Sequence, residues 1–283
     1  MLDVFITGAS GYIGSAITRV LVGRGHRVRG LARSARAEAV VRAAGGEPVR
    51  GSLTDLAVLA GAVGDAVIHT AATDTADRPV VDEAAVTAML AAGPAVFVTT
   101  TGVPRARSSR VPVAEDDTAA PEGPLAWLAD AEDRVLTADV RGVVVRPPMV
   151  YGAGGGPVAR LVGQARADGV ARYVDEGANV WSTVHVTDLA EAYALLLETP
   201  ARGVFHAAEA SPVALADLMA AVGHAADVPV RSWPLSEALA THGPMAGFLA
   251  MDAALDAGRL RDLGWTPTTG DLRGGVVGDL RSR

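Results

Sequence analysis

Short apolar runs alternate with amphipathic stretches through the first half of this 283-residue chain. Short apolar runs predict strands at residues 2–7, 66–69, 95–100 and 142–146, and we also expect strands at residues 27–32 and 47–50. Between them, apolar positions recur at helical spacing over residues 12–24, 35–44, 54–62, 80–92 and 125–139. Runs such as VFIT and VVVR have no polar alternation, as is typical of strands buried on both faces.

Strands that alternate with helices in this way predict a parallel sheet covered on both faces. We therefore expect an α/β fold with a doubly wound, Rossmann-like sheet. The second half is less regular, with a glycine-rich loop at residues 152–156, helices at 158–168, 188–198, 215–222 and 252–262, and a strand at 203–207. We expect one domain over residues 1–283, in which residues 1–152 form mainly a dinucleotide-binding core. Residues 153–283 are expected to form mainly a small C-terminal substrate lobe and to return elements to the core.

Composition narrows the classes of function. The chain has no Cys and no Lys, so arginine supplies all 25 basic side chains against 32 acidic ones, a net charge of −7. Cysteine-based metal sites are excluded, and we assign no metal ligand. An acidic chain with 4% aromatic residues argues against nucleic-acid binding. No apolar run approaches the length of a membrane span, and no signal-peptide pattern is present, so we expect a cytoplasmic protein.

Three glycines directly follow the first predicted strand and open the first predicted helix. Gly8, Gly11 and Gly14 have the spacing at which a chain turns tightly and its backbone approaches a pyrophosphate. The N–H groups at the start of the helix would face that anion. The alternative is a tight turn without a ligand. We expect a dinucleotide here because the motif lies between a strand and a helix.

The end of the second strand indicates which dinucleotide is bound. An acidic residue here would bind the ribose hydroxyls of NAD, but the chain has Arg33 and Ser34, with Arg36 nearby. A guanidinium group suits a 2′-phosphate. The alternative is a set of solvated arginines. We favour NADP(H) and keep NAD(H) as the alternative.

Six segments, in order along nearly the whole chain, resemble the extended or atypical short-chain dehydrogenase/reductase family, the NAD-dependent epimerase/dehydratase-like group. They are TGASGYIGS (7–15), GHRVRGLAR (25–33), DAVIHTAA (65–72), VVVRPPMVYGAGGG (143–156), STVHVTDLAEAYALLLE (182–198) and RLRDLGWTP (259–267). The resemblance implies that the cofactor is bound by Gly8, Ser10, Gly11, Tyr12, Ile13, Gly14, Arg33, Ser34, Ala71, Ala72, Thr100, Pro148, Met149 and Val150.

The same resemblance fails at the catalytic pair. The family's reductases use a Tyr-x-x-x-Lys pair and an upstream Ser or Thr. Aligning Glu132 with the family's usual Glu places Pro124 and Leu128 at the Tyr and Lys positions. The upstream hydroxyl is present among residues 99–101, and we favour Thr101 as the group that binds a substrate carbonyl. The alternative is a threonine selected for its strand propensity.

A relocated acid would have to replace the missing pair. We assign His69 and Tyr151 to this role, and keep Tyr173 and His185 as further candidates; for each, the alternative is a structural side chain. We interpret Asp188 as a helix cap. Trp127, Tyr173 and Trp181 are candidates for a substrate pocket, or else for ordinary core packing.

These observations favour an NADP(H)-dependent reductase of a small carbonyl-type or conjugated metabolite, using a non-standard acid. One alternative is a lyase, isomerase or cyclase on the same scaffold, for which Asp74 and Asp77 are candidates. Another is a nucleotide-sensing protein without catalysis. We expect a small-molecule substrate, no nucleic-acid or membrane partner, and a monomer or homodimer.

Overall fold

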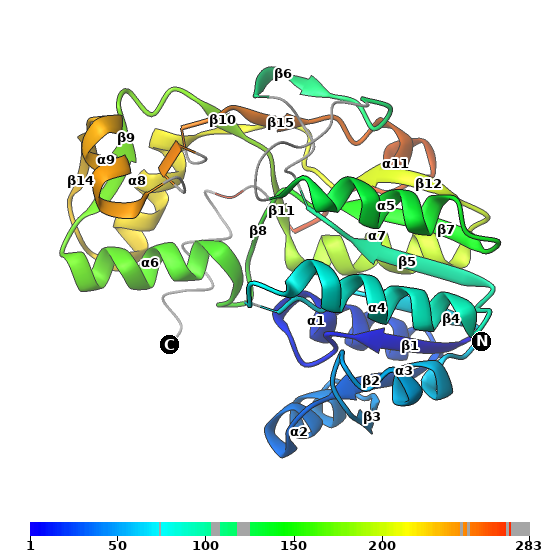
Figure 1. Ribbon diagram of the computed structural model, residues 1–283. Helices are drawn as coiled ribbons and strands as arrows, with labels where there is room; N and C mark the ends of the chain where they lie inside the picture. The colour runs from blue at the N-terminus through cyan, green and yellow to red at the C-terminus, as the bar shows by residue number, and fades with distance from the viewer. Residues whose placement is uncertain are drawn as a thin grey trace. The chain divides into compact units, whose positions relative to one another are not determined.

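The computed structural model describes residues 1–73, 75–102, 108–117, 125–243, 246–247, 250–269 and 272 (Figure 1). Within it the chain divides into two compact units, which are described separately. Unit 1 comprises Met1–Arg105, Ala120–Arg146 and Leu189–Phe205. Unit 2 comprises Ala106–Ala119, Pro147–Asp188 and His206–Arg283.

Unit 1 is built on a seven-stranded sheet with the order β12-β7-β5-β4-β1-β2-β3. Its strands are β1 (Asp3–Thr7), β2 (Arg27–Ala32), β3 (Glu47–Arg50), β4 (Ala66–His69), β5 (Val96–Thr100), β7 (Arg141–Arg146) and β12 (Gly203–His206). Parallel ladders join neighbours from β3 through to β7. The strand order reverses at β1, and ligands of such sheets bind beside that point, at the carboxyl ends of the strands. The predicted doubly wound fold is confirmed.

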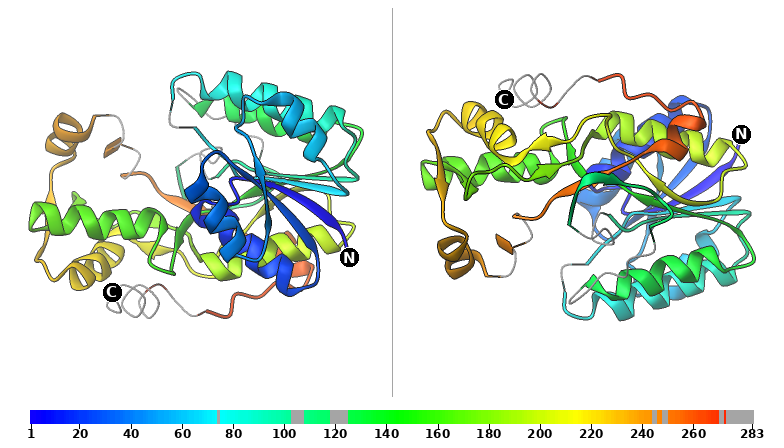
Figure 2. Two further views of the ribbon diagram at one scale, coloured as in Figure 1. Left: turned by 90° about the horizontal axis from the view of Figure 1, so that it is seen from below. Right: turned by 90° about the horizontal axis from the view of Figure 1, so that it is seen from above.

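Helices cover both faces of this sheet. They are α1 (Tyr12–Gly23), α2 (Ala35–Ala43), α3 (Leu56–Ala62), α4 (Arg78–Ala91), α5 (Trp127–Leu136) and α7 (Val186–Glu198). Figure 2 shows α1 and α7 on one face and α4 and α5 on the other. Phe5 and Phe97 on the strands and Leu59 and Met89 on the helices are fully buried in one cluster. The continuous apolar runs in the sequence thus form strands packed on both sides.

Unit 2 contains shorter elements. Its strands are β6 (Ser109–Val113), β8 (Met149–Tyr151), β9 (Ala171–Val174), β10 (Val180–Trp181), β11 (Thr183–His185), β13 (Val213–Ala214), β14 (Val230–Trp233) and β15 (Ala253–Leu255). Its helices are α6 (Gly156–Asp168), α8 (Leu215–Ala226), α9 (Leu235–His242) and α11 (Gly258–Asp262). The strands form a sheet with the order β13-β10-β15-β6 and two pairs, β11-β8 and β14-β9. Val158 and Val162 of α6 pack with Leu218 and Val222 of α8 in its core.

One predicted element of unit 2 is wrong. The helix expected at residues 252–262 is instead the strand β15 followed by the short helix α11. Residues 253–255 pair with β6 and β10, so tertiary pairing overrides the helical preference of an Ala- and Leu-rich segment. The other short strands of unit 2 were not predicted, because two to five residues give no usable periodicity.

Candidate cofactor and active-site residues

The glycine loop turns back sharply between β1 and α1. Gly8 has a φ of +75°, which favours glycine, and a Cβ there would lie 2.8 Å from the backbone nitrogen of Ala71. The backbone N–H of Gly11 donates to the carbonyl of Gly8 at 2.8 Å. A Cβ on Gly14 would lie 2.2 Å from that same carbonyl oxygen. The motif is therefore required for the turn itself, and Gly8 packs closely against Thr70 and Ala71, which follow β4.

The start of α1 fits an anion. Gly11, the N-cap residue, is extended and has no side chain with which to cap the helix. The first turn carries no acidic residue. The first N–H groups of a helix have no acceptor within the helix, and its dipole favours negative charge at this end. These residues fit the pyrophosphate of a dinucleotide.

The polar side chains that follow β2 differ in their hydrogen bonds. Arg33 and Arg36 are exposed. Ser34 is the N-cap of α2 and accepts the backbone N–H of Ala37 at 3.2 Å, so its side chain already has a structural role. Arg50, at the end of β3, is in register with Ala32, the residue before Arg33. It was not among the residues predicted to bind the nucleotide. Its guanidinium donates to Glu38 at 2.7 Å.

Thr100 ends β5 and faces a buried tyrosine. Its hydroxyl lies 2.5 Å from the hydroxyl of Tyr193 on α7. Burial raises the pKa of Tyr193 well above its ordinary value, and the Thr100 hydrogen bond opposes this only in part. Tyr193 therefore stays protonated, and the pair fixes α7 against the end of β5. This tyrosine was not predicted from the sequence.

Thr101 belongs to a buried charged cluster. Its hydroxyl donates to one carboxylate oxygen of Glu132 at 2.7 Å. Arg146 donates to the same oxygen through Nε at 2.9 Å and to the other through Nη2 at 2.5 Å. Glu132 and Arg146 are 1% and 4% exposed. Leu128, at the family's Lys position, is buried on α5, the helix that also carries Glu132. Pro124, at the family's Tyr position, lies outside the described residues.

His69 is held at both ring nitrogens. Nδ1 lies 2.7 Å from the hydroxyl of Thr7, and Nε2 lies 2.9 Å from a carboxylate oxygen of Asp82. The side chain is 2% exposed. Because both nitrogens already have partners in the fold, this geometry favours a structural histidine that joins β1, β4 and α4.

Tyr151 lies in a polar cluster within unit 2. Its hydroxyl donates to Glu209 at 2.8 Å, and its ring contacts His185 edge-on with centroids 5.3 Å apart. Glu209 also accepts the hydroxyl of Thr183 at 2.7 Å and the backbone N–H of His185 at 3.2 Å. Burial raises the pKa of Glu209, against the opposing effect of these hydrogen bonds. Tyr151 itself is fully buried.

The neighbouring residues of this segment have backbone roles. Met149 N–H donates to the carbonyl of Ser182 at 3.2 Å, and Val150 pairs with Val184 in the β8–β11 ladder. The carboxylate of Asp188 accepts the backbone N–H groups of Thr268 and Thr269, at 3.0 and 3.1 Å. Asp188 therefore fixes the segment after the Leu-Gly-Trp-Thr-Pro stretch, instead of capping its own helix as we had predicted.

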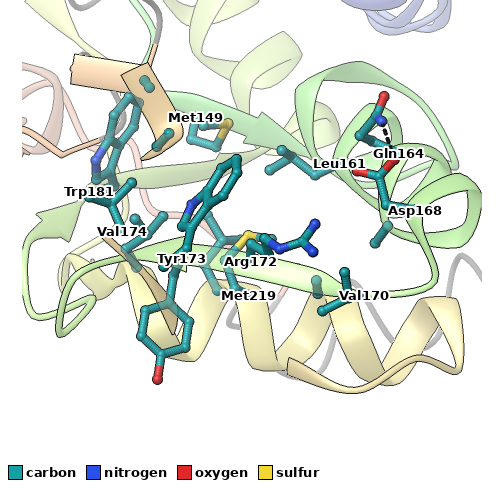
Figure 3. A pocket seen from close by; sticks show the side chains of 17 residues that line it. Met149, Leu161, Gln164, Asp168, Val170, Arg172, Tyr173, Val174, Trp181 and Met219 are labelled. Carbon is teal, nitrogen blue, oxygen red and sulfur yellow. Dashed lines mark hydrogen bonds between the residues drawn. The ribbon is translucent and has the colours of Figure 1, made fainter. Parts of the chain in front are cut away.

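The four residues predicted to bind substrate are divided between the units, and Thr101 and Trp127 belong to unit 1. Trp127, in unit 1, lies under the guanidinium of Arg78 at 5.2 Å. Tyr173 and Trp181 both line a cavity within unit 2 (Figure 3). Asp77 is exposed at the start of α4, and Asp74 lies outside the described residues. Within the part of the chain that the structure describes, no three His, Asp or Glu side chains gather as metal ligands, and no helix could span a membrane.

A doubly wound sheet with an uncapped, glycine-lined helix start defines a dinucleotide-binding protein. The model of the NAD dependent epimerase/dehydratase family matches residues 4–96. Uncharacterized protein C2A9.02 of Schizosaccharomyces pombe is 34% identical, over 98% of this chain and 99% of that protein. The chain therefore belongs to the NAD dependent epimerase/dehydratase family.

Two further similarities bear on fold and chemistry. The 4-hydroxy-2-methyl-3-oxo-4-farnesyl-3,4-dihydroquinoline-1-oxide ketoreductase of Stigmatella aurantiaca is 32% identical, over 76% of this chain and 70% of that enzyme. The crystal structure of the UDP-glucose 4-epimerase of Thermus thermophilus with NAD has a TM-score of 0.80 at 22% identity, covering 99% and 98% of the two chains. The second likeness supports the fold alone.

Proposed function

We propose that the protein is an NADP(H)-dependent reductase of a small carbonyl-type or conjugated metabolite. The observation that carries the proposal is the start of α1, where a glycine loop leads into a helix without a side-chain cap or an acidic residue. The ketoreductase activity named for the Stigmatella relative supports carbonyl reduction as the chemistry. The bound nicotinamide nucleotide would supply the hydride.

The chain's own residues would hold the cofactor at two places. Gly8, Gly11 and Gly14 with the first turn of α1 would bind the pyrophosphate, and Arg33 would bind the 2′-phosphate of NADP. Arg33 and Ser34 are both exposed, but the side-chain oxygen of Ser34 already caps α2. We therefore assign the phosphate preference to Arg33.

Among the candidate acids, Thr101 fits contact with the substrate best. His69 and Tyr151 both have their polar atoms in contacts within the fold, and Tyr151 is fully buried. Thr101 is half-buried and has one O–H donor, which now points to Glu132. If the hydroxyl turns to the substrate carbonyl, Glu132 keeps both hydrogen bonds from Arg146. The proposed role of Thr101 is thus to donate a hydrogen bond to the carbonyl oxygen while hydride is added to the carbonyl carbon, and the resulting alkoxide would take its proton from solvent water.

The cofactor assignment is tested by titrating the protein with NADPH and NADH in parallel, followed by fluorescence. We expect tighter binding of NADPH. Arg33→Ala should weaken NADPH binding by about tenfold, equal to roughly 1.4 kcal/mol, and leave NADH binding unchanged. Arg19→Ala, a change of the same kind on the exposed side of α1, is the control. Equal loss for both nucleotides would contradict the role of Arg33, and binding of neither would overturn the proposed function.

The role of Thr101 is tested with two substitutions of similar size. Thr101→Val removes the hydroxyl, and we expect kcat to fall about 10- to 100-fold with the NADPH dissociation constant unchanged. Thr101→Ser keeps a hydroxyl and should retain most of the activity. The measurement is NADPH oxidation with a panel of ketones and conjugated carbonyl compounds. Equal kcat values for the valine and serine variants would remove Thr101 from the site.

A further inference from the structure

Unit 2 contains a cavity of about 100 Å³ between α6, α8, β9 and β14. Of the 17 described residues that line it, only Gln164, Asp168 and Arg172 carry an amide or a charged group. The others are aliphatic or aromatic, and most of them lie on seven elements: β8, α6, β9, β10, α8, β14 and α9. Figure 3 shows Gln164 and Asp168, joined by a hydrogen bond of 2.9 Å, at one end of the cavity. The lining is therefore apolar with a small polar edge.

The size of the cavity fits part of a small molecule. An enclosed apolar cavity of roughly 150 Å³ is known to take up benzene. A cavity of about 100 Å³ therefore accepts a chain of a few carbons or most of one ring. Arg172 is exposed at its edge, so a longer ligand can extend into solvent.

The charge of the lining excludes a diphosphate as the preferred ligand. Phosphate groups are bound by several arginine, lysine or backbone donors. Arg172 is the one cationic residue among the described lining residues, and its guanidinium lies over the ring of Trp233 at 5.3 Å. A nucleotide sugar would leave its phosphates without partners in this cavity.

Met149 belongs both to the residues predicted to bind the cofactor and to the lining of the cavity. It lies in the segment after Arg146 that the family resemblance assigns to the nicotinamide, and its side chain also lines the cavity. Trp181 and Tyr173, which the sequence suggested as substrate residues, line the same space. A ligand bound in the cavity would thus contact one residue predicted to bind the cofactor and two predicted to bind the substrate.

We propose that this cavity binds the hydrocarbon chain or ring of the carbonyl substrate, so that the enzyme reduces ketones with an apolar substituent in preference to nucleotide sugars. This inference rests on the proposed reductase function for its reaction, but not for its binding. The occupant would be an aliphatic chain or an aromatic ring attached to the carbonyl carbon. Its affinity would come from apolar burial against Leu161, Met219 and Trp181.

Binding is measured on the cofactor-free protein with methyl ketones of four, six and eight carbons. Trp181 and Trp233 line the cavity, so tryptophan fluorescence reports occupancy. We expect the dissociation constant to fall about fourfold for each added methylene until the cavity is full. A dissociation constant independent of chain length, or tighter binding of UDP-glucose than of the eight-carbon ketone, would overturn the proposal.

A cavity-filling variant locates the binding. Leu161→Trp on α6 should abolish the dependence on chain length. Arg160→Trp, which adds the same indole at an exposed neighbour outside the lining, should retain it. Circular dichroism checks the fold of both, and the series on the unaltered protein tests the proposal even if Leu161→Trp fails to fold. An unchanged series in a folded Leu161→Trp variant would overturn it.

Turnover separates this inference from the reductase function. Chain-length-dependent binding without NADPH oxidation would support the cavity and contradict the reductase. NADPH oxidation at the same kcat/KM for all three ketones would support the reductase and contradict the cavity.

Discussion

Replacement of Gly14 by alanine is expected to weaken NADPH binding by about 100-fold. The new Cβ would lie 2.2 Å from the carbonyl oxygen of Gly8, 2.7 Å from its carbonyl carbon and 3.0 Å from Cα of Ala9. All three are backbone atoms, which cannot move aside by a change of rotamer. The loop must shift away from the start of α1, and such overpacking also costs about 1–3 kcal/mol of stability. Fluorescence titration and thermal unfolding measure the two effects.

Two other glycines, Gly11 in the same motif and Gly23 at the end of α1, provide controls for this prediction. A Cβ on Gly23, at the end of α1, meets nothing within 4 Å, so Gly23→Ala should bind NADPH normally and gain up to about 1 kcal/mol of stability. A Cβ on Gly11 would lie 3.0 Å from the Gly8 carbonyl, so Gly11→Ala should have an intermediate effect and keeps the test valid if Gly14→Ala does not fold. Normal NADPH affinity in a folded Gly14→Ala protein would contradict the assignment.

Most of the sheet of unit 1 could be predicted from the sequence because β1, β4, β5 and β7 contain continuous apolar runs. The expected strands at 27–32, 47–50 and 66–69 have the observed bounds. The helix expected from residue 54 starts at Leu56 instead, since Asp55 turns back to accept the N–H and hydroxyl of Ser52 at 2.7 and 2.9 Å. Such a hydrogen bond between a side chain and the nearby backbone competes with helix formation, and the spacing of apolar residues does not reveal it.

The site was only partly predictable. The glycine loop follows from a local pattern and Thr101 from the family resemblance, whereas the partners of Thr101 come from a helix and a strand distant in sequence. One signal was available for Glu132: it lies at helical spacing with the buried Leu128, Ala131 and Val135, and a buried carboxylate requires a partner. Nothing in the sequence pairs it with Arg146. The cavity of unit 2 is lined from seven elements, of which the sequence predicted only the helices α6 and α8.

Glu132→Gln is expected to lower the free energy of unfolding by about 3–5 kcal/mol. The substitution removes one charge of an ion pair whose members are 1% and 4% exposed, and leaves the Arg146 guanidinium buried without a counter-charge. Urea unfolding measures the effect. Glu83→Gln is the control, because Glu83 also binds an arginine, Arg134, at 2.6 Å but is 60% exposed. The exposed pair should contribute no more than about 1 kcal/mol.

Removing the charges of both Glu132 and Arg146 distinguishes two effects on the free energy of unfolding: the loss caused by one unpaired buried charge, and the contribution of the intact ion pair. The double variant Glu132→Leu with Arg146→Met should be more stable than either single variant, because apolar side chains of similar volume need no partner. Thr101→Val should cost only about 1 kcal/mol, since Glu132 keeps both hydrogen bonds from Arg146. If Glu132→Gln destabilises the protein no more than Glu83→Gln does, the pair does not hold the end of β7 against α5. A loss of activity in Thr101→Val without such destabilisation would then have to arise from the hydroxyl itself.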